Sequence, residues 1–233
     1  MELDNPFWHA MIGPQRSIAV GDGLARRYPA HVNAHAAIER PTPQAFAELA
    51  RLMTPGETVY VFWGAPLTPP AGWARDIVVG ILQMVCTERA LVGPVEAVQL
   101  SDVDIPAMLE LAEATRPGPL TAGALAVGRF FGVWEGGRLV AMAGERAHCH
   151  GYREISSVCT AADHRGRGLA SRLTGKLVRD ILEDGETPFL HVAAGNEAAI
   201  RTYERLGFEA RTHLWVTGLR YEPRAPHEPV DGD

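Results

Sequence analysis

The feature that most constrains this chain is a glycine-rich turn at residues 164–168, between a predicted strand ending at Thr160 and a helix predicted to run to about Glu183. The start of a helix presents unpaired backbone N–H groups and carries partial positive charge. Gly166 and Gly168 let a ligand approach this backbone without an intervening side chain. The turn therefore predicts an anion site, and a diphosphate fits it best.

A dinucleotide-binding fold is the main rival for such a turn. That fold needs its glycines almost directly after the strand, and an acidic residue at the end of the next strand to hold the ribose. Here residues 161–165 separate the strand from Gly166, and the next predicted strand, Phe189 to Val192, is followed by Ala193-Ala194-Gly195-Asn196. Neither requirement is met, which argues against a nicotinamide cofactor.

A second informative segment is FLHVAAGNEAAIRTYERLGF, residues 189–208. It reads as a short buried strand, a helix capped by Asn196 and a stop at Gly207. Together with the glycine turn, it resembles the Gcn5-related N-acetyltransferase (GNAT) superfamily, and more narrowly its FR47-like branch. Arg165, Gly168 and Ala170 match the family signature, and the resemblance covers roughly Val95 to Tyr221.

The resemblance implies an α/β (α+β) fold, in which helices flank a mixed, mostly antiparallel sheet. Two strands of the family sheet splay apart, and acyl-coenzyme A lies between them. Backbone groups of Val158 and Thr160 would hold the pantetheine arm, and the N–H of Val158 or Cys159 would face the thioester oxygen. Asn196 would contact the arm, cap its helix, or both. The diphosphate would be held by Arg165, Gly166, Arg167, Gly168, Leu169, Ala170 and Ser171.

Acyl transfer to an amine needs two proton carriers. Similar family members use a tyrosine at the position of Tyr203 as general acid, although packing against the core is the alternative role. Glu154 matches the position of a general base in some members, or serves as an ion-pair partner. His191 is a second candidate base or a core histidine, and many relatives use water instead.

Metal and covalent chemistry find less support. In an extended segment His148 and His150 share one face while Cys149 points away, so three ligands do not converge and no metal is predicted. Cys159 has no motif that supplies an adjacent base, which favours a buried thiol over a covalent nucleophile.

A breaker pair within Leu91–Pro94 predicts a domain boundary. Residues 1–92 form an N-terminal α/β domain with two short strands in Ser17 to Tyr28, a helix from Thr42 to Met53 and a strand from Thr58 to Trp63. This order of strands and helix resembles the order in the C-terminal half, which suggests that residues 1–92 are a degenerate GNAT-like unit. Residues 93–222 form the GNAT domain, and residues 223–233 are predicted to be a disordered tail.

Within the GNAT domain, Val103 to Ala114 predicts a helix after the first strand. Phe130 to Trp134 and Leu139 to Ala147 predict a hairpin around Glu135-Gly136-Gly137.

Composition and charge argue against several classes of protein. A formal net charge of −6 argues against nucleic acid as a partner. The apolar run Ile77 to Cys86 is about half the length needed to cross a bilayer, so no membrane association is expected. An N-terminus without an apolar signal core and three unpaired cysteines favour a cytoplasmic protein. A homodimer is left open.

We therefore expect an acyl-CoA-dependent N-acyltransferase. It would transfer acetyl from acetyl-CoA to a primary amine of a small molecule or peptide by direct attack. A non-catalytic acyl-CoA-binding sensor or interaction protein is the alternative.

Overall fold

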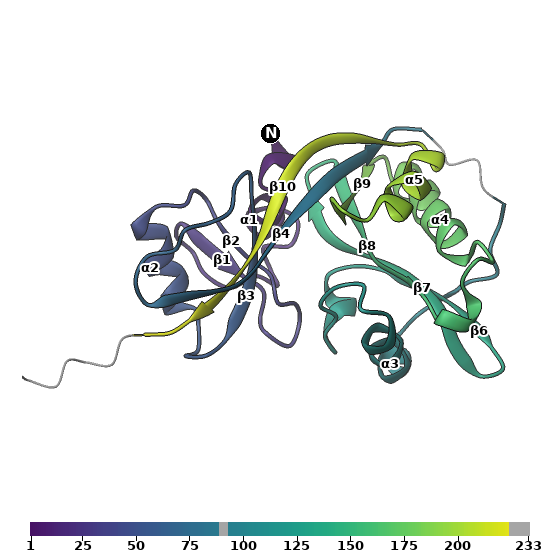
Figure 1. Cartoon of the computed structure of the whole chain (residues 1–233), viewed down its shortest axis with the longest axis horizontal. Coiled ribbons are helices and arrows are strands. Elements are labelled where there is room, and N and C mark those ends of the chain that lie inside the picture. The colour runs from purple at the N-terminus through teal and green to yellow at the C-terminus, as the bar shows by residue number, and fades with distance from the viewer. Residues whose placement is uncertain (89–92, 224–233) are drawn as a thin grey trace, which may run out of the picture.

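A computed structural model describes residues 1–88 and 93–223. Its main feature is one eight-stranded sheet in the order β3-β10-β4-β9-β8-β7-β6-β5, beside a two-stranded sheet β1-β2 (Figure 1). The strands are β1 (Ala25–Arg27), β2 (Ala36–Ile38), β3 (Thr58–Trp63), β4 (Trp73–Cys86), β5 (Val98–Gln99), β6 (Phe130–Glu135), β7 (Arg138–Cys149), β8 (Tyr152–Thr160), β9 (Thr187–Ala193) and β10 (Phe208–Tyr221). The α-helices are α1 (Pro6–Ile12), α2 (Pro43–Arg51), α3 (Ile105–Thr115), α4 (Leu169–Glu183) and α5 (Glu197–Arg205). The mixed, mostly antiparallel sheet predicted from the sequence is confirmed.

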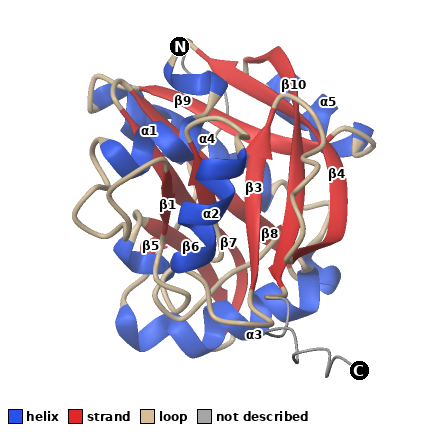
Figure 2. Cartoon of the chain, turned by 90° about the vertical axis from the view of Figure 1, so that its left-hand side faces the viewer, coloured by secondary structure: helices blue, strands red, loops and turns tan. Residues whose placement is uncertain are grey.

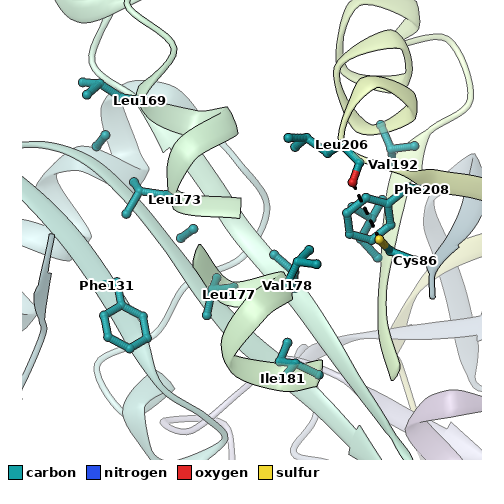
Figure 3. Packing of buried hydrophobic residues seen from close by; sticks show 14 of the residues in the cluster. Cys86, Phe131, Leu169, Leu173, Leu177, Val178, Ile181, Val192, Leu206 and Phe208 are labelled. Atoms are coloured by element: carbon teal, nitrogen blue, oxygen red, sulfur yellow. Dashed lines mark hydrogen bonds between the residues drawn. The ribbon is translucent and has the colours of Figure 1, made fainter. Parts of the chain in front are cut away.

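Helices cover both faces of the sheet. Leu169, Leu173 and Leu177 recur every four residues, so they form one apolar stripe on α4 that packs against Phe131 of β6 (Figure 3). Full burial of each leucine stabilises the fold by about 1.5–3 kcal/mol. On the other face, α3 packs against Phe130 and neighbouring strand residues. This arrangement holds α4 rigidly against the sheet.

Strand β4 changes the expected division of the chain. It precedes the predicted boundary, yet it lies between β9 and β10 and pairs with both. Figure 1 shows β4 and β10 as two long strands, side by side, that join the two sides of the molecule. The boundary itself falls partly in residues 89–92, outside the described residues. The N-terminal region therefore shares the central sheet, and residues 1–92 do not form a separate layer.

The N-terminal region also contributes two helices, α1 and α2, which pack beside its strands (Figure 2). Helix α2 starts where expected, because the Thr42 side chain accepts a hydrogen bond from the N–H of Ala45. Helix α1 was not predicted; Pro6 at its start and buried Phe7 place it on the sheet.

Of the two short strands expected in Ser17 to Tyr28, the structure has β1 and a single bridge between Val20 and Arg27. The N–H groups of Ile18 and Ala19 turn back to the carbonyl of Gln15 and cannot join a strand. The predicted tail, apart from Pro223, lies outside the described residues. Among the described helices, none combines the length and the apolar character needed to cross a bilayer.

Candidate active site

The site begins where two neighbouring strands part. Strands β8 and β9 run parallel and pair only from Tyr152 opposite Thr187 to Ile155 opposite Leu190. Beyond this point a cleft of about 660 Å³ opens between the second half of β8, the turn before α4, and α5. Because no described strand pairs with this edge of β8, its backbone N–H and C=O groups are available to a ligand.

A β-bulge marks the point of separation. In the pairing of β7 with β8, Gly144 lies opposite Ser156 and Met142 opposite Cys159, so Ser157 and Val158 together face one residue of β7. Ser157 adopts a left-handed φ of 54°, which is uncommon for a residue other than glycine. Bulges of this kind redirect backbone groups and are frequent beside active sites. Here the bulge is followed by Val158, which lines the cleft.

The glycine turn forms one end of the cleft. Gly166 and Gly168 have φ values of 77° and 74°, a conformation that side chains disfavour. A Cβ atom built on either residue meets no atom within 4 Å, so the space before the turn is open. Helix α4 has no side-chain hydrogen bond at its N-terminus. Its first N–H groups therefore face the cleft unpaired, as an anion site requires.

The two arginines of the turn, Arg165 and Arg167, have different partners. Arg165 lines the cleft, and its Nε donates to the carbonyl of Thr160 at 3.5 Å. Arg167 instead forms two hydrogen bonds with the carboxylate of Glu135, at 2.9 and 2.7 Å, and does not line the cleft. The sequence could not show this, because Glu135 belongs to the β6–β7 hairpin.

Two hydroxyl groups in the cleft wall have no partner. The side-chain oxygens of Thr160 and Thr174 are buried and form no hydrogen bond within the described residues, and both residues line the cleft. Buried polar groups in folded proteins are nearly always paired, so these oxygens indicate a ligand that carries hydrogen-bonding groups. Thr174 was missed from the sequence; its only signal is a polar residue inside the apolar stripe of α4.

Helix α5 supplies the opposite wall. Asn196 lines the cleft and also caps α5 by accepting a hydrogen bond from the N–H of Ala199 at 3.1 Å, so its two expected roles are compatible. Tyr203 lines the cleft, and its ring packs edge-on against Phe208. Burial raises the pKa of Tyr203 to about 12, which keeps its phenol protonated at neutral pH.

One solved structure resembles this chain over nearly its full length. It is a GNAT-family protein from Novosphingobium aromaticivorans DSM 12444, with 38% sequence identity and a TM-score of 0.89, and the match covers 95% of this chain and 99% of that one. The chain belongs to the GNAT family. The family predicted from the glycine turn and the segment after it is confirmed.

Further comparisons agree with this assignment. The FR47-like protein family model matches residues 130–216. A GCN5-related N-acetyltransferase from Kribbella flavida shares the GNAT fold at 20% identity, with a TM-score of 0.61 over 93% of this chain and 96% of that one.

Two curated relatives are mycothiol acetyltransferases, from Corynebacterium jeikeium (44% identity over 57 residues) and Corynebacterium aurimucosum (40% over 68 residues). These matches cover 24% and 28% of this chain, and only 16% and 22% of the relatives' own length.

The candidate base Glu154 lies outside the cleft of this GNAT chain. Its carboxylate is fully buried and accepts hydrogen bonds from Arg146 Nε at 2.9 Å and Nη2 at 2.6 Å. His191 Nδ1 lies 2.7 Å from the same carboxylate, and Gln83 Nε2 lies 3.0 Å from His191 Nε2. Neither Glu154 nor His191 lines the cleft.

The pKa values of this buried group are consistent with a structural role. Burial alone would raise the pKa of Glu154, but the charge of Arg146 and the hydrogen bonds from Arg146 and His191 hold it well below its ordinary value. Burial lowers the pKa of His191 and outweighs the effect of Glu154, so the imidazole is neutral. A carboxylate that binds protons so weakly is a poor general base at neutral pH.

Of the cysteines and histidines considered for other chemistry, His148 and Cys149 have structural partners. Cys159 is free, and burial raises the pKa of its thiol, which disfavours the nucleophilic thiolate. Cys149 is buried against the carbonyl of Pro6, and His148 Nε2 lies 2.5 Å from Glu186 Oε1. Within the described residues, no three potential ligands come together to hold a metal ion.

A separate cavity of about 580 Å³ lies between residues 14–18, 99–102 and 125–129. Its two arginines, Arg129 and Arg153, are paired with Glu145, Asp184 and Glu186. Because these charges are already paired, the two arginines of this cavity are less available to bind a ligand than the groups that line the cleft between β8 and β9.

Proposed function

We propose that this GNAT protein is an acyl-CoA-dependent N-acetyltransferase that transfers acetyl from acetyl-CoA to an amine. One observation carries the proposal. A single cleft joins an open glycine turn at a helix N-terminus, an unpaired strand edge and a protonated tyrosine. The first two features suit a long ligand with a diphosphate and amide groups, and the third suits protonation of a leaving group.

The residues of the cleft fit coenzyme A along its length. Acetyl-CoA would supply an activated acetyl thioester. The N–H groups of Leu169, Ala170 and Ser171 would hold the diphosphate, with Arg165 adding charge at its edge. The free edge of β8 would bind the pantetheine amides as an added strand does. Thr160 and Thr174 would gain the hydrogen-bond partners that they lack in the protein alone.

The reacting end lies at the bulge. The N–H of Val158 or Cys159 would face the thioester oxygen and stabilise its developing negative charge. Tyr203 would donate its phenolic proton to the departing sulfur, because its pKa keeps that proton in place at neutral pH.

Deprotonation of the acceptor amine is assigned to water. Glu154 and His191 are hydrogen-bonded to each other and do not line the cleft. We therefore infer that they hold β8 and β9 together just before the strands separate. The rate should then follow the fraction of acceptor amine that is neutral, with no additional enzyme pKa between 6 and 8.

Purified protein should bind coenzyme A in a calorimetric titration and release free thiol from acetyl-CoA when a suitable amine is present. Acceptors tested should include small amines, amino acids and peptides with free N-termini. Binding without turnover of any acceptor would instead support a non-catalytic acyl-CoA sensor. Absence of binding would reject both functions.

Replacement of Glu154 tests the structural role. Glu154→Gln leaves Arg146 buried without its counter-charge, so we expect a loss of about 3–5 kcal/mol in the free energy of unfolding. Because the folded-state pKa of Glu154 is lowered, its contribution is complete above the unfolded pKa of about 4.3 and is lost as pH falls. The difference from wild type should shrink below about pH 4.

Urea unfolding of both proteins between pH 3.5 and 7 measures this effect. Asp180→Asn is the matched control, since it breaks the more exposed pair between Lys176 and Asp180 on α4 and should cost less than about 0.5 kcal/mol. If the Glu154→Gln protein had unchanged stability but a strongly reduced rate near pH 7, Glu154 would be the general base and the structural role would be wrong.

A further inference from the structure

The end of α3 carries an arginine in an unusual conformation. Arg116 has φ 52° and ψ 56°, and its N–H donates to the carbonyl of Ala112 at 2.7 Å, which closes the helix. This left-handed position after a helix usually belongs to glycine, because any other side chain is strained there. Residues held in such strain cluster at functional sites.

Arg116 lies near the reacting end of the cleft. At the end of α3, the side chain of Thr115 contacts the thiol of Cys159, and Thr115 and Arg116 line the cleft together with Val158 and Cys159. The end of α3 therefore lies beside Cys159, next to the bulge at Ser157 and Val158.

Arg116 brings a positively charged side chain to the cleft wall. Within the described residues its guanidinium forms no ion pair or hydrogen bond, although Glu113 lines a neighbouring pocket with it. Arg167, by contrast, is bound by Glu135. The side chain of Arg116 is exposed and can reach a ligand.

We propose that Arg116 binds a carboxylate of the acceptor, so that the acceptor is an amine that also carries a carboxylate, such as an amino acid. This inference rests on the proposed N-acetyltransferase function. A guanidinium binds a carboxylate through two parallel hydrogen bonds, which fixes orientation as well as position. Holding the carboxylate at Arg116 would direct the amine of the same molecule toward the bulge at Ser157 and Val158.

The test compares an acceptor that carries a carboxylate with one in which an amide replaces it. Alanine and alaninamide are offered with acetyl-CoA, and kcat/KM is measured for wild type and for Arg116→Gln. We expect the ratio of alanine to alaninamide to fall by about 10- to 100-fold in the variant, as for loss of a hydrogen-bonded charge pair. Arg51→Gln, which removes an exposed arginine in the last turn of α2, is the matched control and should leave the ratio unchanged.

A second variant separates binding from a structural role. Arg116→Gly relieves the left-handed strain and should raise the Tm by about 2–4 °C, while lowering the ratio as Arg116→Gln does. A raised Tm with an unchanged ratio would show that Arg116 only ends the helix, and would overturn the proposal.

The remaining outcomes are distinct. Weaker coenzyme A binding by Arg116→Gln, with the ratio intact, would assign Arg116 to the coenzyme and overturn the proposal. A preference of wild type for succinyl-CoA over acetyl-CoA that is lost in Arg116→Gln, again with the ratio intact, would place the carboxylate on the acyl group and overturn it too. Turnover with an unchanged ratio rejects only this inference, whereas no turnover with any amine rejects the proposed function as well.

Discussion

Gly168→Val should lower the affinity for coenzyme A by about 100-fold or more. Gly168 stands directly before α4 with φ 74°, and a β-branched residue is a severe outlier in that region. Any change of φ that relieves the strain rotates the N–H groups of residues 169–171 away from the diphosphate. The new side chain would also project into space that is open in the protein alone, where the ligand is proposed to lie. Calorimetric titration with coenzyme A measures the loss.

The chain offers a close control for backbone strain. Gly185, just after the other end of α4, has φ 80°, and a Cβ atom built there also meets nothing within 4 Å. Gly185→Val should therefore lower stability about as much as Gly168→Val, by roughly 1–2 kcal/mol, without changing coenzyme A affinity. Equal losses of affinity in the two variants would mean that the glycine turn is not the diphosphate site.

Elements with strong local signals were predicted well. The start of α5 at Asn196 and its stop at Gly207 match the structure, as do the start of α2 after Thr42 and the β6–β7 hairpin around Gly136 and Gly137. In each case the signal is a capping side chain or a glycine with positive φ, which acts within a few residues. Such signals do not depend on which distant segments come together.

The position of β4 could not be predicted, because strand pairing is decided by contacts between distant segments. Its C-terminal half reads as an apolar run that suits a buried strand, but nothing local says that it pairs with β10, more than a hundred residues later. The pairing depends on β9 and β10 being in place on either side. The boundary inferred from Gly93-Pro94 therefore lies between two strands, β4 and β5, of the same sheet.

The difference between local signals and contacts of distant segments also decides which parts of the site could be predicted. The glycine turn and Tyr203 belong to recognisable local segments, and the structure brings them to one cleft. The partners of Glu154 and Arg167 come from other strands, so the sequence could not show that Arg146 and Glu135 bind them. Arg116 was missed for a related reason, since only the packing of α3 against β8 places it in the cleft.

Tyr203→Phe should lower kcat by about 100-fold and leave coenzyme A affinity within about twofold. A general acid contributes roughly 10²- to 10⁴-fold to a rate, and the ring itself, which packs against Phe208, is retained. The phenolic oxygen forms no hydrogen bond within the described residues, so its removal should not reduce stability. A loss of rate at constant Tm would then report on chemistry, because neither packing nor a structural hydrogen bond has changed.

The pH profile strengthens this test. With a pKa of about 12, Tyr203 stays protonated through the range in which amines lose their protons, so the wild-type rate should rise with pH and show no fall below about pH 10. Tyr221→Phe is the control, because Tyr221 packs on Trp73 outside the cleft and should leave kcat unchanged. If Tyr203→Phe kept the full rate, the proton would reach the departing sulfur from another donor, such as water. A wild-type rate that fell between pH 7 and 9 would instead show a proton donor that titrates in that range, which neither Tyr203 nor water does.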